Sequence, residues 1–102
     1  MGLKDAKKLF ILALEEGKYR SEIRGALEET NLLAVGDVTP EFVIKLISRT
    51  RGNEYYTDNH HLDPDTLVHV FKPRIKNEPW YVKSYFESED AVLISVHKSR
   101  HK

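Results

Sequence analysis

Side chains that can move protons or hold phosphate gather in the second half of this sequence. Two adjacent histidines, His60 and His61, stand in a polar stretch, and His97 follows an apolar run. Histidine can accept or donate a proton near neutral pH, because its unperturbed pKa is about 6.5. Lysine and arginine can bind phosphate, and tyrosine can donate to a phosphate oxygen or stack on a base. The candidate cations and phenols are Lys72, Arg74, Tyr81, Lys83, Tyr85 and Lys98.

This set of residue types suits the cleavage of RNA without a metal ion. Such cleavage needs a base for the 2′-hydroxyl proton, an acid for the leaving 5′-oxygen, and positive charge near the phosphorane. Alternating tyrosine and lysine residues are also common on the exposed face of any sheet. Composition alone leaves both interpretations open.

The His60-His61 pair lies among aspartates, which raises the question of a metal site. Adjacent histidines in extended chain point in opposite directions, and neither an HxH nor an HxxxH spacing is present. We therefore expect no metal and no cofactor. Either histidine could act instead as a catalytic acid or base, or simply be part of a loop.

The first half of the chain has the periodicity of amphipathic helices. Apolar residues three and four apart predict a helix over residues 3–16, which Gly17 would end. Ser21 can cap a second helix that continues to about Thr30. Thr39 can cap a third helix that ends before Gly52, and Pro40 suits its first position.

After Gly52 the pattern changes to the alternation typical of strands. We predict strands over residues 67–72, 80–87 and 91–97, with a further edge strand over 55–57. Short turns at 75–79 and 88–90 require neighbouring strands to be antiparallel. The expected fold is α+β, a single domain over 1–102 with N-terminal helices packed on a twisted antiparallel β-meander.

Strand alternation divides the side chains of the meander between two faces. The helices should cover one face, and the predicted core consists of Leu9, Phe10, Phe42, Leu46, Trp80, Val82, Phe86, Val92 and Ile94. The opposite face should present Tyr81, Lys83, Tyr85, Ser95 and His97. His69 or Lys72 would join that face, depending on the register of its strand.

Composition narrows the class of protein. The 102 residues include 16 basic and 16 acidic side chains and no cysteine, which excludes disulfides and fits a reducing compartment. From residue 72 onward there are seven Lys and Arg residues against four Asp and Glu, so this third is mildly basic. No apolar run is long enough to span a membrane, and the first residues do not predict a secretory signal. We therefore expect a cytoplasmic protein without a membrane partner.

Three short motifs in the last third resemble the MqsR family of toxin-antitoxin ribonucleases, which are similar to the wider RelE-like toxins. The motifs are Val70-Phe71-Lys72-Pro73-Arg74, then Tyr81-Val82-Lys83, then Val92-Leu93-Ile94-Ser95. The N-terminal half fits more weakly, through Lys7-Lys8-Leu9, Gly17-Lys18 and Arg24-Gly25-Ala26-Leu27. The resemblance implies helices against a twisted antiparallel sheet, cleavage of mRNA on or off the ribosome that inhibits translation, and a cognate antitoxin protein.

The resemblance also points to site residues, with changes. The functional tyrosine of the family falls on Tyr81, and its C-terminal lysine falls on His97. The other two family positions, a lysine and a glutamine, fall near Tyr56 and Val68. These replacements imply that other groups move the protons in this chain.

We expect His97 to share proton transfer with His60 or His61, which gives a bell-shaped dependence of rate on pH. Arg74 and Lys83 would stabilise the phosphorane while Tyr81 positions the phosphate. Further contacts to RNA are expected from Lys72, Lys83, Tyr85 and Lys98. The alternative is a non-catalytic module that binds RNA or protein on the same sheet face.

Overall fold

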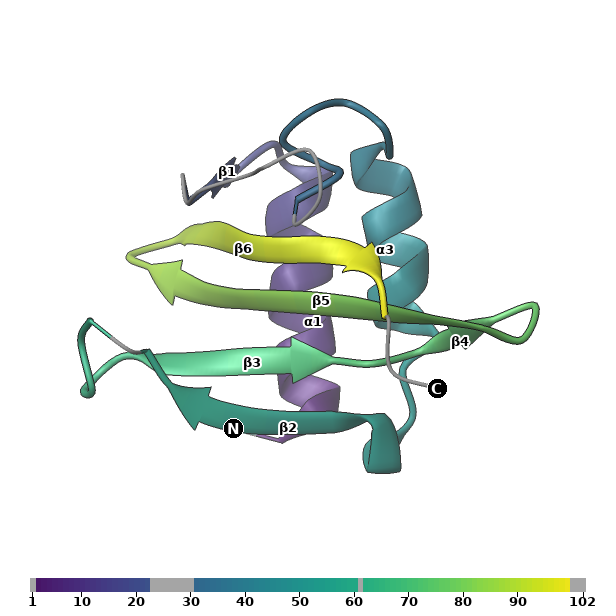
Figure 1. Ribbon diagram of the computed structural model, residues 1–102. Helices are drawn as coiled ribbons and strands as arrows, with labels where there is room; N and C mark the ends of the chain where they lie inside the picture. Colours follow the sequence, from purple (N-terminus) through teal and green to yellow (C-terminus); the bar gives the residue numbers. More distant parts are fainter. Residues whose placement is uncertain (1, 23–30, 61, 100–102) are drawn as a thin grey trace.

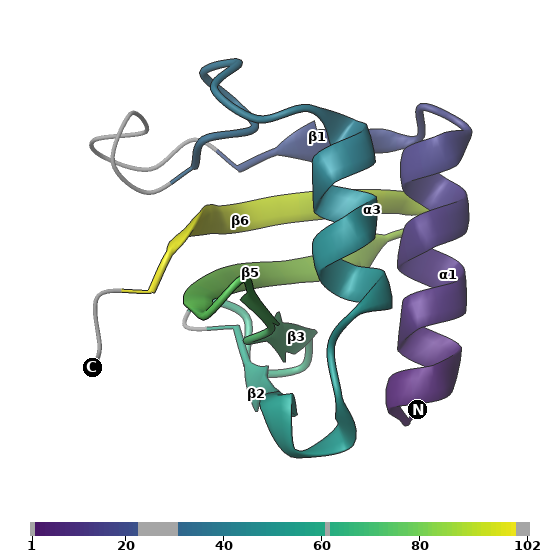
Figure 2. The same ribbon diagram turned by 90° about the vertical axis from the view of Figure 1, so that its right-hand side faces the viewer.

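Two helices lie side by side on one face of a sheet in the computed structural model, which describes residues 2–22, 31–60 and 62–99 (Figures 1 and 2). Helix α1 spans Leu3–Glu15 and helix α3 spans Pro40–Ser48. Both helices confirm the sequence prediction. The remainder of the predicted second helix, residues 23–30, lies outside the described residues.

Local chemistry fixes where these helices begin and end. The Thr39 hydroxyl accepts a hydrogen bond from the backbone N–H of Phe42 at 3.1 Å, which caps α3, and Pro40 occupies the first turn. Gly17 follows α1 with a φ of +73°, a left-handed conformation that favours glycine. The chain then turns at once into the sheet.

The sheet is mixed, with strand order β1-β6-β5-β3-β2, and β4 pairs with β5 off this path (Figure 1). The strands are β1 (Tyr19–Ser21), β2 (Tyr55–Asn59), β3 (Leu67–Phe71), β4 (Arg74–Ile75), β5 (Glu78–Glu87) and β6 (Asp90–Lys98), with a short 3-10 turn at Gly52–Glu54. The meander β3-β5-β6 is antiparallel, as predicted. Strand β1 runs parallel to β6 and was not predicted. Ser21 ends this strand, and the helix that was predicted to follow it falls on residues outside the described ranges.

Two tight turns connect the antiparallel strands. Lys76 and Asn77 have φ values of +51° and +66° between β4 and β5. Two consecutive residues with positive φ are the signature of a two-residue hairpin turn. Ser88, at +57°, lies in the turn between β5 and β6. The two turns fall where the sequence placed them, although Ile75 and Pro79 belong to paired strand segments.

A β-bulge in β6 changes the predicted division of side chains. Lys83 pairs with Ser95, but the next residue of β5, Ser84, pairs with Leu93, so Ile94 is the extra residue. Leu93 therefore packs in the helix-covered cluster. Val92 and Ile94 are buried, but on the opposite face, and their predicted place under the helices is wrong.

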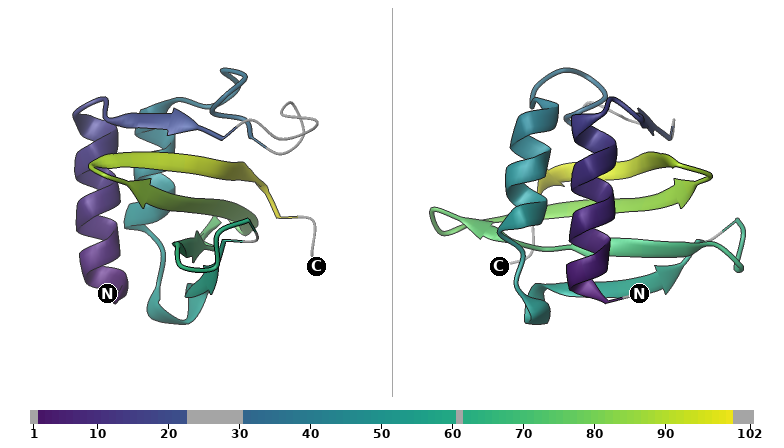
Figure 3. Two further views of the ribbon diagram at one scale, coloured as in Figure 1. Left: turned by 90° about the vertical axis from the view of Figure 1, so that its left-hand side faces the viewer. Right: turned by 180° about the vertical axis from the view of Figure 1, so that it is seen from behind.

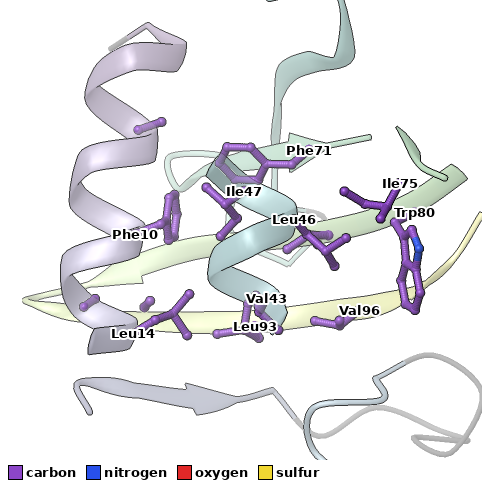
Figure 4. Close-up of a cluster of buried hydrophobic side chains, with 14 residues drawn as sticks. Phe10, Leu14, Val43, Leu46, Ile47, Phe71, Ile75, Trp80, Leu93 and Val96 are labelled. Atoms are coloured by element: carbon purple, nitrogen blue, oxygen red, sulfur yellow. The ribbon is translucent and has the colours of Figure 1, made fainter. Parts of the chain in front are cut away.

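The core fills the space between the helices and the sheet, as Figure 4 shows. Phe10 from α1 stacks on Phe86 at 4.1 Å, and Trp80 meets the edge of Phe42 from α3 at 4.9 Å. The view from behind in Figure 3 shows both helices lying across the strands. Leu9 was predicted in this core, but its side chain is 41% exposed because it faces the solvent side of α1.

His69 lies on the helix side of the sheet. The β3–β5 register pairs it with Ser84, and its ring meets Phe10 at 5.2 Å. A 2.7 Å hydrogen bond joins its Nδ1 to the Tyr55 phenol. Burial lowers the pKa of His69, because an apolar environment disfavours the charged ring. Of the two alternatives left open by the sequence, His69 does not join the opposite face, and Lys72 is an exposed residue that follows the end of β3.

Candidate functional site

The sheet face opposite the helices carries most of the candidate residues. Strand pairing sets Tyr56 of β2 beside Val70 of β3, and Val70 beside Lys83 of β5. Lys83 in turn lies beside Ser95 of β6. We call this surface the open face; its further members are Asp58, Val68, Tyr81, Tyr85, Ile94 and His97.

Tyr81 and His97 form a pair at one end of the open face. They are direct cross-strand partners, and their rings stack at 5.2 Å with an angle of 22°. The Nδ1 of His97 lies 2.8 Å from the carbonyl oxygen of Lys98. A carbonyl oxygen only accepts, so Nδ1 carries the proton and donates it. In the neutral ring, Nε2 then holds the lone pair and can act as a base.

Tyr56 completes this end of the face. It is 45% exposed, and it shares the open face with Tyr81. Burial, together with the Tyr56 phenol and the Asp58 carboxylate, raises the pKa of Tyr81 to about 12. Tyr81 thus keeps its proton at neutral pH and remains a hydrogen-bond donor. We call Tyr56, Tyr81 and His97 the His97 cluster.

A second histidine and tyrosine pair lies at the other end of β5. The backbone N–H of Leu62 donates to Nδ1 of His60 at 3.1 Å, so the ring proton sits on Nε2. Nε2 in turn donates to the Glu22 carboxylate at 3.0 Å. The Tyr85 hydroxyl donates to the same carboxylate oxygen at 3.2 Å, and its ring meets His60 edge-on at 5.1 Å. We call Glu22, His60 and Tyr85 the His60 cluster.

The His97 cluster and the His60 cluster are separate sites on the open face. Tyr81 and Tyr85 are four residues apart in a continuous strand, which places them about 13 Å apart. The structure therefore does not bring His60 together with His97, and both ring nitrogens of His60 have partners. His61, the other candidate, lies outside the described residues.

The candidate cations differ in exposure and in whether they are already held in an ion pair, and so in their ability to bind a phosphate. Lys83 is half-buried between Tyr81 and Tyr85 on the open face. Lys72 and Arg74 are exposed and line one hollow of about 460 Å³ together with Tyr56 and Trp80. Lys98 instead pairs with Glu78 at 2.6 Å and lies 6.0 Å over the Trp80 ring. Lys72 and Arg74 thus adjoin the His97 cluster, whereas Lys98 is held in an ion pair.

Sequence reasoning missed two members of these clusters as site residues. Tyr56 follows the alternation of its edge strand, and its pairing with Val70 would have placed it on the open face. Glu22 directly follows Ser21 in the segment predicted as a second helix, and no local signal indicates that it reaches residues 60 and 85. Contacts over such sequence separations depend on the assembled sheet.

Comparisons with known proteins add no family to this description. Neither models of protein families nor curated protein sequences match the chain. Within the described ranges, no three His, Asp or Glu side chains gather closely enough to hold a metal ion. The same ranges contain no helix of the length and apolar character needed to cross a membrane.

Proposed function

We propose that this chain is a metal-independent endoribonuclease that cleaves mRNA, the toxin of a toxin-antitoxin system. The observation that carries the proposal is the His97–Tyr81 stack, in which His97 donates through Nδ1 and keeps its Nε2 lone pair for a substrate. A proton acceptor beside a protonated phenol, next to exposed cations, suits attack of a 2′-hydroxyl on the adjacent phosphate.

The chemical step assigns one role to each member of the His97 cluster. Nε2 of His97 takes the 2′-hydroxyl proton as the 2′-oxygen bonds to phosphorus. The Tyr81 phenol donates to a non-bridging oxygen, where negative charge develops. The bond from phosphorus to the 5′-oxygen breaks, and that oxygen takes its proton from the Tyr56 hydroxyl. The products are a 2′,3′-cyclic phosphate and a 5′-hydroxyl, and solvent restores both protonation states.

Positive charge near this cluster comes from two directions. Lys83 lies two residues along β5 from Tyr81, on the same face, and Lys72 lines the hollow that Tyr56 borders. Lysine ammonium groups stabilise a phosphorane without needing to transfer a proton. We assign the His60 cluster a structural role, because it joins Glu22, beyond β1, to β5 and to the chain after β2.

The wider biological role follows from the resemblance described above. A ribonuclease that stops translation is tolerated by a cell only when a cognate antitoxin protein neutralises it. We propose a cytoplasmic location for the same reason, since the substrate is mRNA. The proposed substrate, mRNA, is exposed while it is translated on the ribosome.

Inducible expression and an assay of purified protein test the proposal together. Wild-type protein should arrest growth and cleave RNA in the presence of a chelator, leaving cyclic phosphate ends. His97→Ala should relieve the arrest and strongly slow cleavage, while Lys8→Ala, an exposed change on α1, should do neither. Activity that required a divalent metal, or that survived His97→Ala, would contradict the mechanism.

A non-catalytic RNA-binding module is the second candidate. The exposed Tyr56 ring beside Lys72 and Arg74 favours it, because an aromatic ring next to cations binds single strands without chemistry. This candidate predicts that purified protein binds RNA tightly and leaves it intact. The same assay therefore separates the two functions.

A further inference from the structure

A basic hollow lies beside the hollow that borders the His97 cluster. It has a volume of about 490 Å³ and contains one carboxylate, from Glu54. Its cationic residues come from the end of α3, from the start of the 3-10 turn and from the β4–β5 hairpin. They are Arg49, Arg51, Arg74 and Lys76, and we call this feature the arginine hollow.

Little of this positive charge is neutralised within the described residues. The Glu54 carboxylate accepts a hydrogen bond from the backbone N–H of Arg51 at 2.8 Å, and this bond stabilises the 3-10 turn. None of the four cationic side chains forms an ion pair with a residue that the structure describes. Arg20, by contrast, pairs with both Glu87 and Asp90. In a chain with balanced charges, this concentration of unpaired cations points to an anionic ligand.

The β4–β5 hairpin carries two of these side chains. The Arg74 guanidinium donates to the carbonyl of Asn77 at 3.2 Å, across the hairpin turn. Lys76 is an exposed residue of the turn itself. A guanidinium oriented by one hydrogen bond still has other N–H groups for a phosphate.

The arginine hollow continues toward the His97 cluster. The adjoining hollow shares Arg74 and Glu54 with it and is bordered by Lys72 and Tyr56. Tyr56 shares the open face with Tyr81 and His97, so cations and aromatic rings follow one another from the arginine hollow to the proposed base. A ligand with regularly spaced negative charges could occupy both ends at once.

We propose that the arginine hollow is a second phosphate-binding site, which holds the RNA backbone away from the bond that is cleaved. This inference rests on the proposed function for its substrate, and its site is separate from the reacting groups. Arginine matches the geometry of phosphate oxygens and tolerates any base sequence. The hollow thus contributes affinity for long RNA and adds nothing to the chemical step.

Binding of uncleavable RNA tests this proposal without relying on cleavage. The probe is a 2′-O-methyl oligoribonucleotide, and the variant is Arg49→Gln with Arg51→Gln. For a single strand each lost phosphate contact lowers the slope of log affinity against log salt by about 0.7. The double variant should therefore lose a slope of about 1.4. Lys4→Gln with Lys8→Gln removes the same charge from α1 and should leave the slope unchanged.

Two further measurements make the outcome decisive. Arg49→Lys with Arg51→Lys should keep the salt slope, because charge is retained, and thermal melting of each variant checks that it is folded. With cleavable RNA, the glutamine variant should raise KM for a long substrate and keep kcat, and a dinucleotide should be cleaved as by wild type. A wild-type slope in the glutamine variant, or equal losses in the α1 control, would overturn the second site. Absence of cleavage in every protein would refute the proposed function and leave the binding result standing.

Discussion

Two histidine and tyrosine pairs share the open face, yet their rings are prepared for different tasks. His60 receives an N–H from Leu62 on Nδ1 and gives its Nε2 proton to Glu22. His97 donates from Nδ1 to a backbone carbonyl and keeps the lone pair on Nε2. The His60 side chain is 6% exposed, while His97 is half-buried at the end of β6.

The difference shows how the backbone around a histidine selects its tautomer. A ring nitrogen that faces a backbone N–H must accept, so it carries the lone pair. A ring nitrogen that faces a carbonyl must donate, so it carries the proton. The same residue types therefore yield a structural junction at one end of the face and a candidate base at the other. Residue type alone, which is all that the sequence provides, cannot distinguish these two cases.

The comparison is tested most strongly by removing each histidine in turn. His97→Ala should lower the rate of RNA cleavage by about 10²–10⁴-fold, the usual contribution of a general base. Its melting temperature should stay close to that of wild type, because His97 is only half-buried and lies near the end of β6. Cleavage is measured on purified protein at saturating RNA, so that binding and chemistry are separated. Full activity in this variant would remove the functional distinction between the clusters.

His60→Ala should give the reverse pattern, a loss of stability with little loss of rate per folded molecule. It removes a hydrogen-bond donor from the Glu22 carboxylate, and a loss of about 1–3 kcal/mol is expected when a buried polar group loses its partner. Urea denaturation measures this change. Tyr85→Phe removes another donor to Glu22 and should also lower the stability of the protein. A large fall in rate for folded His60→Ala would instead support the shared proton transfer expected from sequence.

The sequence predicted most of the secondary structure because local signals were strong. Thr39 and Pro40 mark the start of α3, and alternation marks β5 and β6. Strand β1 escaped prediction because its three residues carry no alternation and obtain their hydrogen bonds from β6, far along the chain. A short strand of this kind is defined by its neighbour.

The candidate site was predictable in part. Alternation placed Tyr81 and His97 on the same face, and the two residues proved to be cross-strand partners. Alternation failed beyond the bulge, because one extra residue in β6 reversed the faces of Leu93 and Ile94. The roles of the histidines could not be read from sequence, since each depends on which backbone group faces the ring.

Tyr81→Phe should have a smaller effect on rate than His97→Ala. The variant keeps the ring that stacks on His97 but loses the hydroxyl proposed to meet the phosphate. Loss of one such hydrogen bond is expected to cost about 1.5–3 kcal/mol when the acceptor is charged, or roughly ten- to a hundredfold in rate. The fall should appear in kcat, because the bond strengthens as charge develops. An effect confined to KM would assign Tyr81 to ground-state binding only.

The dependence of rate on pH separates proton transfer by two histidines from a mechanism in which Tyr56 is the acid. If two histidines share the proton transfers, the profile is bell-shaped near neutrality. If the acid is a phenol and not a second histidine, no descending limb is expected near neutrality. Initial rates across this range, in buffers of constant ionic strength, decide the question. A descending limb below pH 9 would contradict the assignment of Tyr56.

The smallest effect concerns stability in alkali. The pKa of Tyr81 rises to about 12 in the folded protein, above its ordinary value of 10, chiefly because of burial. Between these two values the unfolded chain loses a proton that the folded chain retains, so stability falls as pH rises through this window. Tyr81→Phe removes the group and should flatten that decline. Urea denaturation of both proteins at several alkaline pH values measures this decline. Equal slopes of stability against pH in the two proteins would show that the Tyr81 phenol is more exposed to solvent than its place on the sheet indicates.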